Sequence, residues 1–197
     1  LVVLDDADLE TAVSCALNGA MFSTGQRCTA SSRIIVTDGI YDRFLNRMTE
    51  RLEALTVGNA LLPETDIGPV VDETQLAKVE SYIQIGLDDG ATLHWGGKRL
   101  KRETPGYYLQ PALFTDTDSD MRITREEIFG PVAPLIPFDS EGEAIAFAND
   151  TDVGLAAYIY TRDIGRVWRV SEALEYGMVG INEGIISNEM APFGGVK

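Results

Sequence analysis

The sequence contains few of the residues that build metal sites or disulfide frameworks. Among 197 residues it has one histidine, His94, and two cysteines, Cys15 and Cys28. A structural zinc site is usually tetrahedral and takes most of its four ligands from Cys and His side chains. Two cysteines without a CxxC spacing also provide no disulfide framework. We therefore expect neither a metal centre nor a stabilising disulfide.

Long apolar runs and an excess of positive charge are also missing. No run reaches the about 18 apolar residues of a membrane-spanning helix, and residues 1–8 carry acid where a signal peptide would carry Lys or Arg. Sixteen basic and 31 acidic residues give a formal net charge of −15. Such a charge repels nucleic-acid phosphates and anionic lipid headgroups. We expect no nucleic-acid partner, no membrane association and a cytoplasmic location.

The pattern of apolar residues predicts the fold class. With 45% hydrophobic residues, the chain is long enough to bury one sizeable core, as a single domain. Helical periodicity alternates with short β-branched runs, which predicts βαβ crossovers. The predicted fold is therefore α/β, a mostly parallel sheet flanked by helices. The expected helices cover residues 7–21, 41–55, 73–87, 141–149 and 164–176, and the expected strands cover 33–37, 92–95, 108–114, 132–138, 156–161 and 178–182.

The chain has no phosphate-binding loop of a known nucleotide-binding type. Neither GxGxxG nor GxxxxGK[ST] occurs in the sequence. These motifs hold phosphates through glycine-rich backbone at a helix N-terminus. A nucleotide would therefore be bound mainly by residues outside this chain.

The two cysteines differ in their expected surroundings. Cys15 lies inside the predicted helix 7–21, where a packing role is expected. Cys28 lies in the connection that follows Gly25 and precedes a strand. There the neighbouring Arg27 and oriented backbone amides would favour a reactive thiolate. From these residues alone, Cys28 is either an inert loop cysteine or a nucleophile.

Three segments resemble signature motifs of the aldehyde dehydrogenase superfamily, in the order and with the spacing of that family. They are GQRC at residues 25–28, EEIFGPV at 126–132 and PFGG at 192–195. The resemblance extends over residues 1–197 and includes the family's catalytic-domain fold. It implies that Cys28 is the catalytic nucleophile.

The resemblance also implies a reaction. The Cys28 thiolate would add to an aldehyde, and the Cys28 backbone N–H would stabilise the oxyanion of the thiohemiacetal. Hydride transfer to NAD or NADP would leave a thioester, which an activated water hydrolyses to the carboxylic acid. In the family, the glutamate that matches Glu127 binds the hydroxyls of the nicotinamide ribose. The aromatic residue that matches Phe129 packs beside the ribose and the nicotinamide. Without the motif, Glu126 and Glu127 would be a solvated pair before a Gly-Pro turn.

The resemblance further implies a set of substrate contacts. Phe193 matches an aromatic residue of the family's substrate tunnel, although alone it would be a core aromatic. Ile185 and Ser187 match the loop that shapes the far end of this tunnel. Arg27 and Thr29 are candidate substrate contacts because they flank the nucleophile, and Arg27 could equally be structural.

Two relationships bear on the aldehyde. Residues 25–36 resemble 2-oxoglutarate semialdehyde dehydrogenases, whereas residues 173–177 and 184–189 resemble succinate semialdehyde dehydrogenases. Both groups oxidise an aldehyde with a distant carboxylate, for which the Ser187 hydroxyl is a suitable donor. Phe22 stands where succinate semialdehyde dehydrogenases commonly have a substrate-binding arginine, which favours a longer or less polar ω-semialdehyde. Ala30 stands where some have a second cysteine, which argues against a local disulfide switch.

The resemblance places other parts of the enzyme outside this sequence. The general-base glutamate, the oxyanion asparagine and the coenzyme-binding domain would precede residue 1, and an oligomerisation strand would follow residue 197. We expect residues 1–197 to be the catalytic domain of a longer homo-oligomer, a dimer or tetramer, and to be inactive alone. Two alternatives remain: a thiol hydrolase that pairs Cys28 with His94, and a non-catalytic α/β interaction module.

Overall fold

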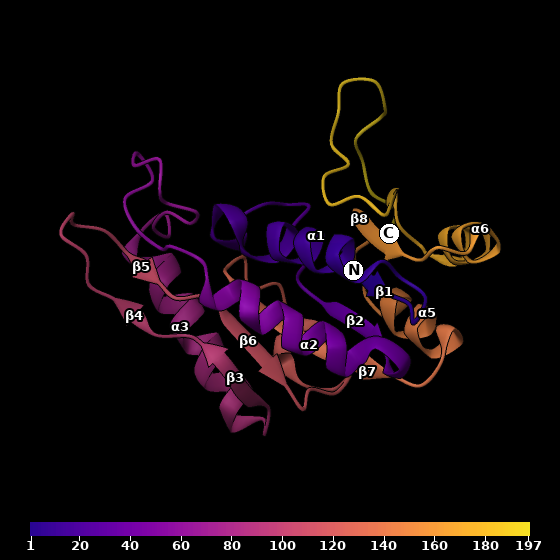
Figure 1. Ribbon diagram of the computed structural model, residues 1–197, viewed down its shortest axis with the longest axis horizontal. Helices are drawn as coiled ribbons and strands as arrows, with labels where there is room; N and C mark the ends of the chain where they lie inside the picture. The colour runs from indigo at the N-terminus through magenta and orange to yellow at the C-terminus, as the bar shows by residue number, and fades with distance from the viewer.

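A seven-stranded sheet forms the centre of the molecule in a computed structural model that describes all 197 residues (Figure 1). Its strand order is β3-β6-β7-β2-β1-β8-β9, and only the β3–β6 pairing is antiparallel. The strands are β1 (Val2–Val3), β2 (Ile34–Thr37), β3 (Thr92–Gly96), β6 (Ala112–Thr115), β7 (Val132–Phe138), β8 (Ala156–Tyr160) and β9 (Met178–Ile181). A separate two-stranded ribbon pairs β4 (Arg99–Leu100) with β5 (Tyr108–Leu109). The predicted α/β class with a mostly parallel sheet is confirmed.

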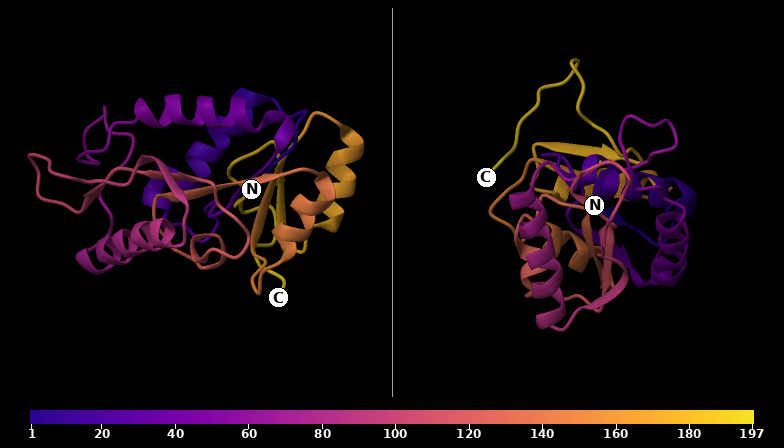
Figure 2. Two further views of the ribbon diagram at one scale, coloured as in Figure 1. Left: turned by 90° about the horizontal axis from the view of Figure 1, so that it is seen from below. Right: turned by 90° about the vertical axis from the view of Figure 1, so that its left-hand side faces the viewer.

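Helices cover both faces of the sheet (Figure 2). They are α1 (Leu9–Met21), α2 (Asp38–Glu53), α3 (Glu73–Asp88), α4 (Arg122–Arg125), α5 (Glu141–Asn149) and α6 (Ile164–Ala173), with a 3-10 helix η1 (Phe22–Gly25) after α1. Side chains alternate between the two faces along each strand. Ile34 and Val36 pack with α1 and α2, whereas Ile35 packs with α5 and α6. The third buried cluster joins α3 to the strands at the β3 end of the sheet. None of the helices combines the length and the hydropathy that crossing a bilayer requires.

One predicted strand is wrong. Residues 108–114 do not form a continuous strand but divide into β5 and β6, which belong to different sheets. Pro111 lies at the break, and proline has no N–H to donate to a strand ladder. The short elements β1, β4 and α4 were not predicted, because segments of two to four residues carry no measurable periodicity.

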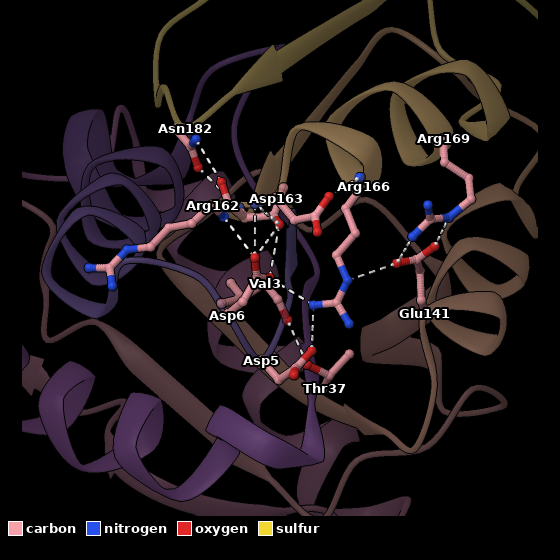
Figure 3. A network of polar contacts seen from close by, with 11 residues as sticks. Val3, Asp5, Asp6, Thr37, Glu141, Arg162, Asp163, Arg166, Arg169 and Asn182 are labelled. Carbon is pink, nitrogen blue, oxygen red and sulfur yellow. Dashed lines mark hydrogen bonds and ion pairs between the residues drawn. The ribbon is translucent and has the colours of Figure 1, made fainter.

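The direction of the strands defines two edges of the sheet. Since β1, β2, β7 and β8 are parallel, their amino ends share one edge and their carboxyl ends share the other. The carboxyl edge carries a network of ion pairs between Asp5, Asp6, Glu141 and Arg166 (Figure 3). The segments that lead into β2 and β7 lie at the amino edge, and these are the segments with the first two family-like motifs.

The last part of the chain projects from this body. The loop after β9, drawn in yellow, extends away from the sheet in Figures 1 and 2. Met190, in this loop, is 88% exposed. The chain then returns to the body, where the Val196 N–H donates to the Gly154 carbonyl at 2.9 Å.

Candidate functional site

Cys28 lies in an exposed turn that leads into β2. The Ala30 N–H donates to the Arg27 carbonyl at 3.0 Å, so Cys28 and Thr29 are the two central residues of the turn. The Cys28 N–H donates to no protein acceptor. Cys28 is therefore exposed at the turn, and its amide has no partner within the protein.

A left-handed stretch of backbone brings the chain from α1 to this turn. Ser23, Thr24 and Gly25 have φ values of 54°, 53° and 65°. At Gly25 the conformation also permits a close approach, because a Cβ there would lie 2.3 Å from the carbonyl oxygen of Gly130. The segment that leads to Cys28 therefore contacts the backbone of the EEIFGPV motif directly.

The Arg27 side chain is directed at the end of α1. Its Nη2 donates to the carbonyl oxygens of Asn18 and Gly19, the latter at 3.3 Å. Carbonyls in the last turn of a helix lack helical partners and carry partial negative charge, so a guanidinium satisfies them well. Arg27 thus connects the Cys28 turn to the carboxyl end of α1. A contact between Arg27 and substrate stays a prediction.

A cavity of about 360 Å³ lies at the amino edge of the sheet. Arg27, Cys28, Glu127 and Phe129 all line it, so residues from two motifs about 100 positions apart meet around one space. Its volume lies in the range of small-molecule and cofactor sites, about 300–1,000 Å³. Cys28 is thus neither sealed in the core nor remote from Phe129.

Helix α3 holds the backbone of the EEIFGPV motif. Phe129 has a positive φ of 59°, which is strained for a bulky residue. The Gln75 side-chain amide donates to the carbonyl oxygens of Ile128 at 3.1 Å and of Phe129 at 2.8 Å. The Lys78 ammonium donates to the Glu127 carbonyl at 3.1 Å. These contacts fix the backbone from which the Phe129 ring and the Glu127 carboxylate project.

The two glutamates of this motif have different surroundings. Arg122 and Tyr82 bond the Glu126 carboxylate and lower its pKa to about 2. The Glu127 side chain is exposed and makes no hydrogen bond or ion pair within the protein. Glu126 is therefore occupied by neighbours on the protein, whereas Glu127 has a free carboxylate beside the cavity.

The other predicted substrate contacts lie apart from this cavity. Ile185 lines a second, open cavity of about 650 Å³ between β9 and the projecting loop. Ser187 and Phe193 are exposed and line neither cavity. Thr29 does not line the first cavity, but its carbonyl accepts a hydrogen bond from Tyr158, which does. The structure therefore groups Arg27, Cys28, Glu127 and Phe129 and separates Ile185, Ser187 and Phe193 from them.

The positions of His94 and Cys15 bear on the alternative chemistries. His94 is exposed on the edge strand β3, which β6 and β7 separate from β2. Three strand spacings correspond to roughly 14 Å, too far for His94 to act as a base for Cys28. Cys15 is half-buried in α1, and burial raises the pKa of its thiol. Neither residue lines the Cys28 cavity.

Tyr158 is a site residue that the sequence did not reveal. It belongs to β8, is 2% exposed, and reaches the cavity from the face of the sheet that packs against α1. The apolar strand β8 contains two tyrosines, so their hydroxyls are expected to be buried. A buried tyrosine hydroxyl usually has a hydrogen-bond partner. The identity of that partner depends on tertiary structure, and so the sequence pattern alone does not identify it.

Comparisons with known proteins agree with this geometry. The model of the aldehyde dehydrogenase family matches residues 1–197. The chain is 48% identical to an NADP(+) succinate-semialdehyde dehydrogenase of Escherichia coli and 45% identical to a glutarate-semialdehyde dehydrogenase of Pseudomonas putida. All of this chain, but only 40% of each relative, is covered. A betaine aldehyde dehydrogenase structure from Staphylococcus aureus, in complex with NAD+, matches with a TM-score of 0.96 and 41% identity over 100% of this chain and 39% of its own.

Proposed function

Because the chain belongs to the aldehyde dehydrogenase family, we propose that it supplies the catalytic cysteine of an enzyme that oxidises an aldehyde to a carboxylic acid with NAD or NADP. The main support is the shared cavity of Cys28, Glu127 and Phe129. Since the chain spans about two fifths of the curated relatives it matches, we assign residues 1–197 to a catalytic domain. The coenzyme-binding domain would lie outside these residues.

The nucleophile turn can perform the covalent step. The Cys28 Sγ would form a bond to the carbonyl carbon, and the carbonyl electron pair would move to oxygen. The Cys28 N–H, which has no protein acceptor, would donate to that oxyanion. After oxidation, a water molecule would attack the thioester carbon, the C–S bond would break, and the Cys28 thiolate would be regenerated.

The motif at 126–132 fits the nicotinamide end of a coenzyme. When bound, the coenzyme would supply the hydride acceptor. The free carboxylate of Glu127 would accept hydrogen bonds from two ribose hydroxyls, and Phe129 lines the same cavity. Gln75 and Lys78 would keep this segment in place through its carbonyls.

We propose a dicarboxylate semialdehyde as the substrate. The succinate- and glutarate-semialdehyde relatives support this class. The three arginines that line the cavity are already engaged: Arg27 with α1, Arg33 with the Ala148 carbonyl at 3.0 Å, and Arg125 with Asp150 at 2.7 Å. Each of these guanidinium groups is thus bonded within the protein, and Phe22 stands where succinate semialdehyde dehydrogenases commonly have a substrate-binding arginine. A substrate at least as long as glutarate semialdehyde, or less polar, is therefore favoured over succinate semialdehyde.

The proposal extends to the enzyme's surroundings. Both cysteines are free, and a nucleophilic Cys28 needs a reducing compartment such as the cytoplasm. Several apolar side chains near the projecting loop are exposed, among them Met190 and Phe193. Such patches often mark protein contacts, and we propose that the complete enzyme is a homo-oligomer.

Replacement of each cysteine tests the proposal. In protein expressed from the complete reading frame that contains this sequence, Cys28→Ser should lower aldehyde-dependent NAD(P)H formation by at least about a thousandfold, because a hydroxyl is a much weaker nucleophile than a thiolate. Cys15→Ser, the matched control, should retain most of the rate. A panel of aldehydes of increasing length, assayed with both coenzymes, should give a higher kcat/KM for glutarate than for succinate semialdehyde. Activity that survives in Cys28→Ser would refute the assignment.

A further inference from the structure

A buried hydroxyl from β8 meets the turn that carries Cys28. The Tyr158 OH donates to the Thr29 carbonyl at 2.9 Å, across 129 positions of sequence. The Thr29 carbonyl accepts no other protein hydrogen bond. Burial raises the pKa of Tyr158, so the hydroxyl keeps its proton at neutral pH and remains a donor.

The turn is held from two sides. On its amino side, Arg27 is bonded to the last turn of α1. On its carboxyl side, Tyr158 bonds the Thr29 carbonyl. Cys28 lies between these two anchors, and its own N–H and side chain are not fixed by any hydrogen bond. The direction of the Cys28 thiol and amide therefore depends on the two anchors.

Tyr158 is itself rigidly placed. Its strand pairs with β1 on one side and β9 on the other. Its ring packs closely against β9, because a Cβ on Gly180 would lie 2.9 Å from Tyr158 Cδ1. A tyrosine ring has only two side-chain torsion angles, and a ring packed in this way can hold its hydroxyl at a fixed point. The hydrogen bond thus connects the turn to a strand that is paired on both sides.

From this arrangement we infer that Tyr158 is a positioning residue, which orients the turn so that the Cys28 thiol and N–H face one reacting carbonyl. The inference rests on the proposed function, since it takes Cys28 as the nucleophile. The rate of such a reaction falls when the nucleophile and the oxyanion donor are no longer held in fixed positions relative to the carbonyl. Tyr158 acts through the Thr29 carbonyl and touches neither reacting atom.

Tyr158→Phe removes the hydroxyl and keeps the ring. Tyr108→Phe is the matched control, because Tyr108 is also buried, at 3% exposure. Its hydroxyl forms a hydrogen bond with the Thr104 hydroxyl at an O–O distance of 2.8 Å, and neither residue lines the Cys28 cavity. The rate of Cys28 alkylation by iodoacetamide, measured by peptide mass spectrometry, reports the reactivity of the thiol directly. Cys15 in the same molecules provides an internal reference.

We expect Tyr158→Phe to slow Cys28 alkylation and to lower kcat by about five- to tenfold, the equivalent of one ordinary hydrogen bond. KM for the aldehyde should change by less than about twofold, because the hydroxyl that is removed is already bonded to the Thr29 carbonyl and the ring that lines the cavity is kept. Cys15 alkylation should not change, and Tyr108→Phe should match the unmodified protein in all of these measurements. Unchanged Cys28 reactivity and kcat in folded Tyr158→Phe would overturn the inference.

A second substitution guards against loss of folding. Incorporation of 3-fluorotyrosine at position 158 keeps the ring and the hydroxyl donor. We expect the rate of Cys28 alkylation and kcat to stay within about twofold of the values for the unmodified protein. A loss as large as that of Tyr158→Phe would show that the donated hydrogen bond is not responsible. If Cys28→Ser retains activity, the proposed function fails; if Cys28 is essential but insensitive to Tyr158→Phe, only the positioning role fails.

Discussion

Ser23 and Thr24, shortly before Cys28, adopt a left-handed backbone conformation that non-glycine residues seldom adopt. Such a conformation costs roughly 1–2 kcal/mol per residue. Thr24 recovers part of this cost, since its buried hydroxyl donates to the Ser23 carbonyl at 2.7 Å and accepts from the Gln26 side chain. Ser23 is exposed and its side chain makes no hydrogen bond, so its strain is uncompensated.

We therefore expect Ser23→Gly to raise the free energy of unfolding by about 0.5–1 kcal/mol, because relief of strain exceeds the added chain entropy. Chemical denaturation of the purified protein measures the change. Ser32→Gly, in the same connection but without a positive φ, is the control and should lower stability slightly. A lower denaturation midpoint for Ser23→Gly would contradict the strain argument.

At the residue scale, the sequence identified the candidate reactive and coenzyme-binding residues, but not the contacts that hold them in place. Cys28, Glu127 and Phe129 were identified from motif resemblance, and the structure places them around one cavity. Their catalytic and coenzyme-binding roles stay predictions. The helix cap made by Arg27 and the hydrogen bond from Tyr158 were not predicted, because each joins segments whose contact depends on the folded topology.

At the scale of elements, Asn182 prolongs the β8–β9 pairing beyond the last residue of β9. Its side-chain amide accepts from the Thr161 N–H at 3.1 Å and donates to the Thr161 carbonyl at 2.9 Å. The side chain thus replaces a backbone peptide in the ladder while its own φ of 53° turns the chain into the projecting loop. Asparagine suits both tasks, since it tolerates the left-handed region.

Asn182→Ala should lower the free energy of unfolding by about 1–2 kcal/mol, because Thr161 is buried and would lose both partners. Thermal unfolding provides the measurement. Asn188→Ala is the control: Asn188 lies in the same loop, and its side chain accepts only the Met190 N–H. Equal Tm values for the two variants would show that the ladder extension contributes no stability.

Most elements followed from periodicity, and the exceptions have physical causes. The helix expected at residues 41–55 begins at Asp38 instead, because Thr37 already ends β2 and acts as the residue before the first helical turn. The strand expected at 108–114 failed at Pro111, which should have been read as a break. β1 is a two-residue strand, and only its parallel partners β2 and β8 define it.

At the scale of the whole molecule, Asp6 connects segments from both ends of the sequence. Its carboxylate accepts from the Thr161 hydroxyl, the backbone N–H groups of Arg162 and Asp163, and the Arg166 guanidinium (Figure 3). Burial alone would raise the Asp6 pKa, but these donors outweigh it and the pKa is lowered. The carboxylate is thus stabilised in its charged form by the fold.

This lowered pKa predicts acid sensitivity with a definite sign. Stabilisation by ionised Asp6 is complete above the unfolded-state pKa of about 3.9 and is lost as the pH falls from there toward the folded-state value. Asp6→Asn should lower the free energy of unfolding at pH 7 by about 1–3 kcal/mol and reduce the further loss on acidification. Denaturant unfolding at neutral and acidic pH measures both effects.

The neighbouring residue supplies the control for this experiment. The Asp5 side chain is 50% exposed and bonds only Arg166. Asp5→Asn should therefore change stability by less than about 1 kcal/mol, as exposed ion pairs do. Similar losses for the two substitutions would contradict the special role of Asp6.

The cavity lies at the amino edge of the sheet. In open parallel sheets, ligands usually bind outside the carboxyl ends of the strands. Here the carboxyl edge is occupied by the Asp6 and Arg166 network, and the cavity lies at the amino edge, where Cys28 and Phe129 precede their strands. Parallel strands share an amino edge whatever their order, so the expected strands at 33–37 and 132–138 already imply that both motifs lie at one edge. The packing that encloses a cavity at this edge is tertiary, and periodicity does not provide it.

The close approach of Gly25 to Gly130 limits how such an enzyme can be redesigned. A side chain at residue 25 would push the segment that leads to Cys28 away from the segment that contains Phe129, because its Cβ would overlap the Gly130 carbonyl. Libraries that seek new aldehydes should therefore leave both glycines unvaried. Diversity is better placed at Phe22 and in the projecting loop around Ile185, where altered side-chain size reshapes surfaces without separating the two motifs.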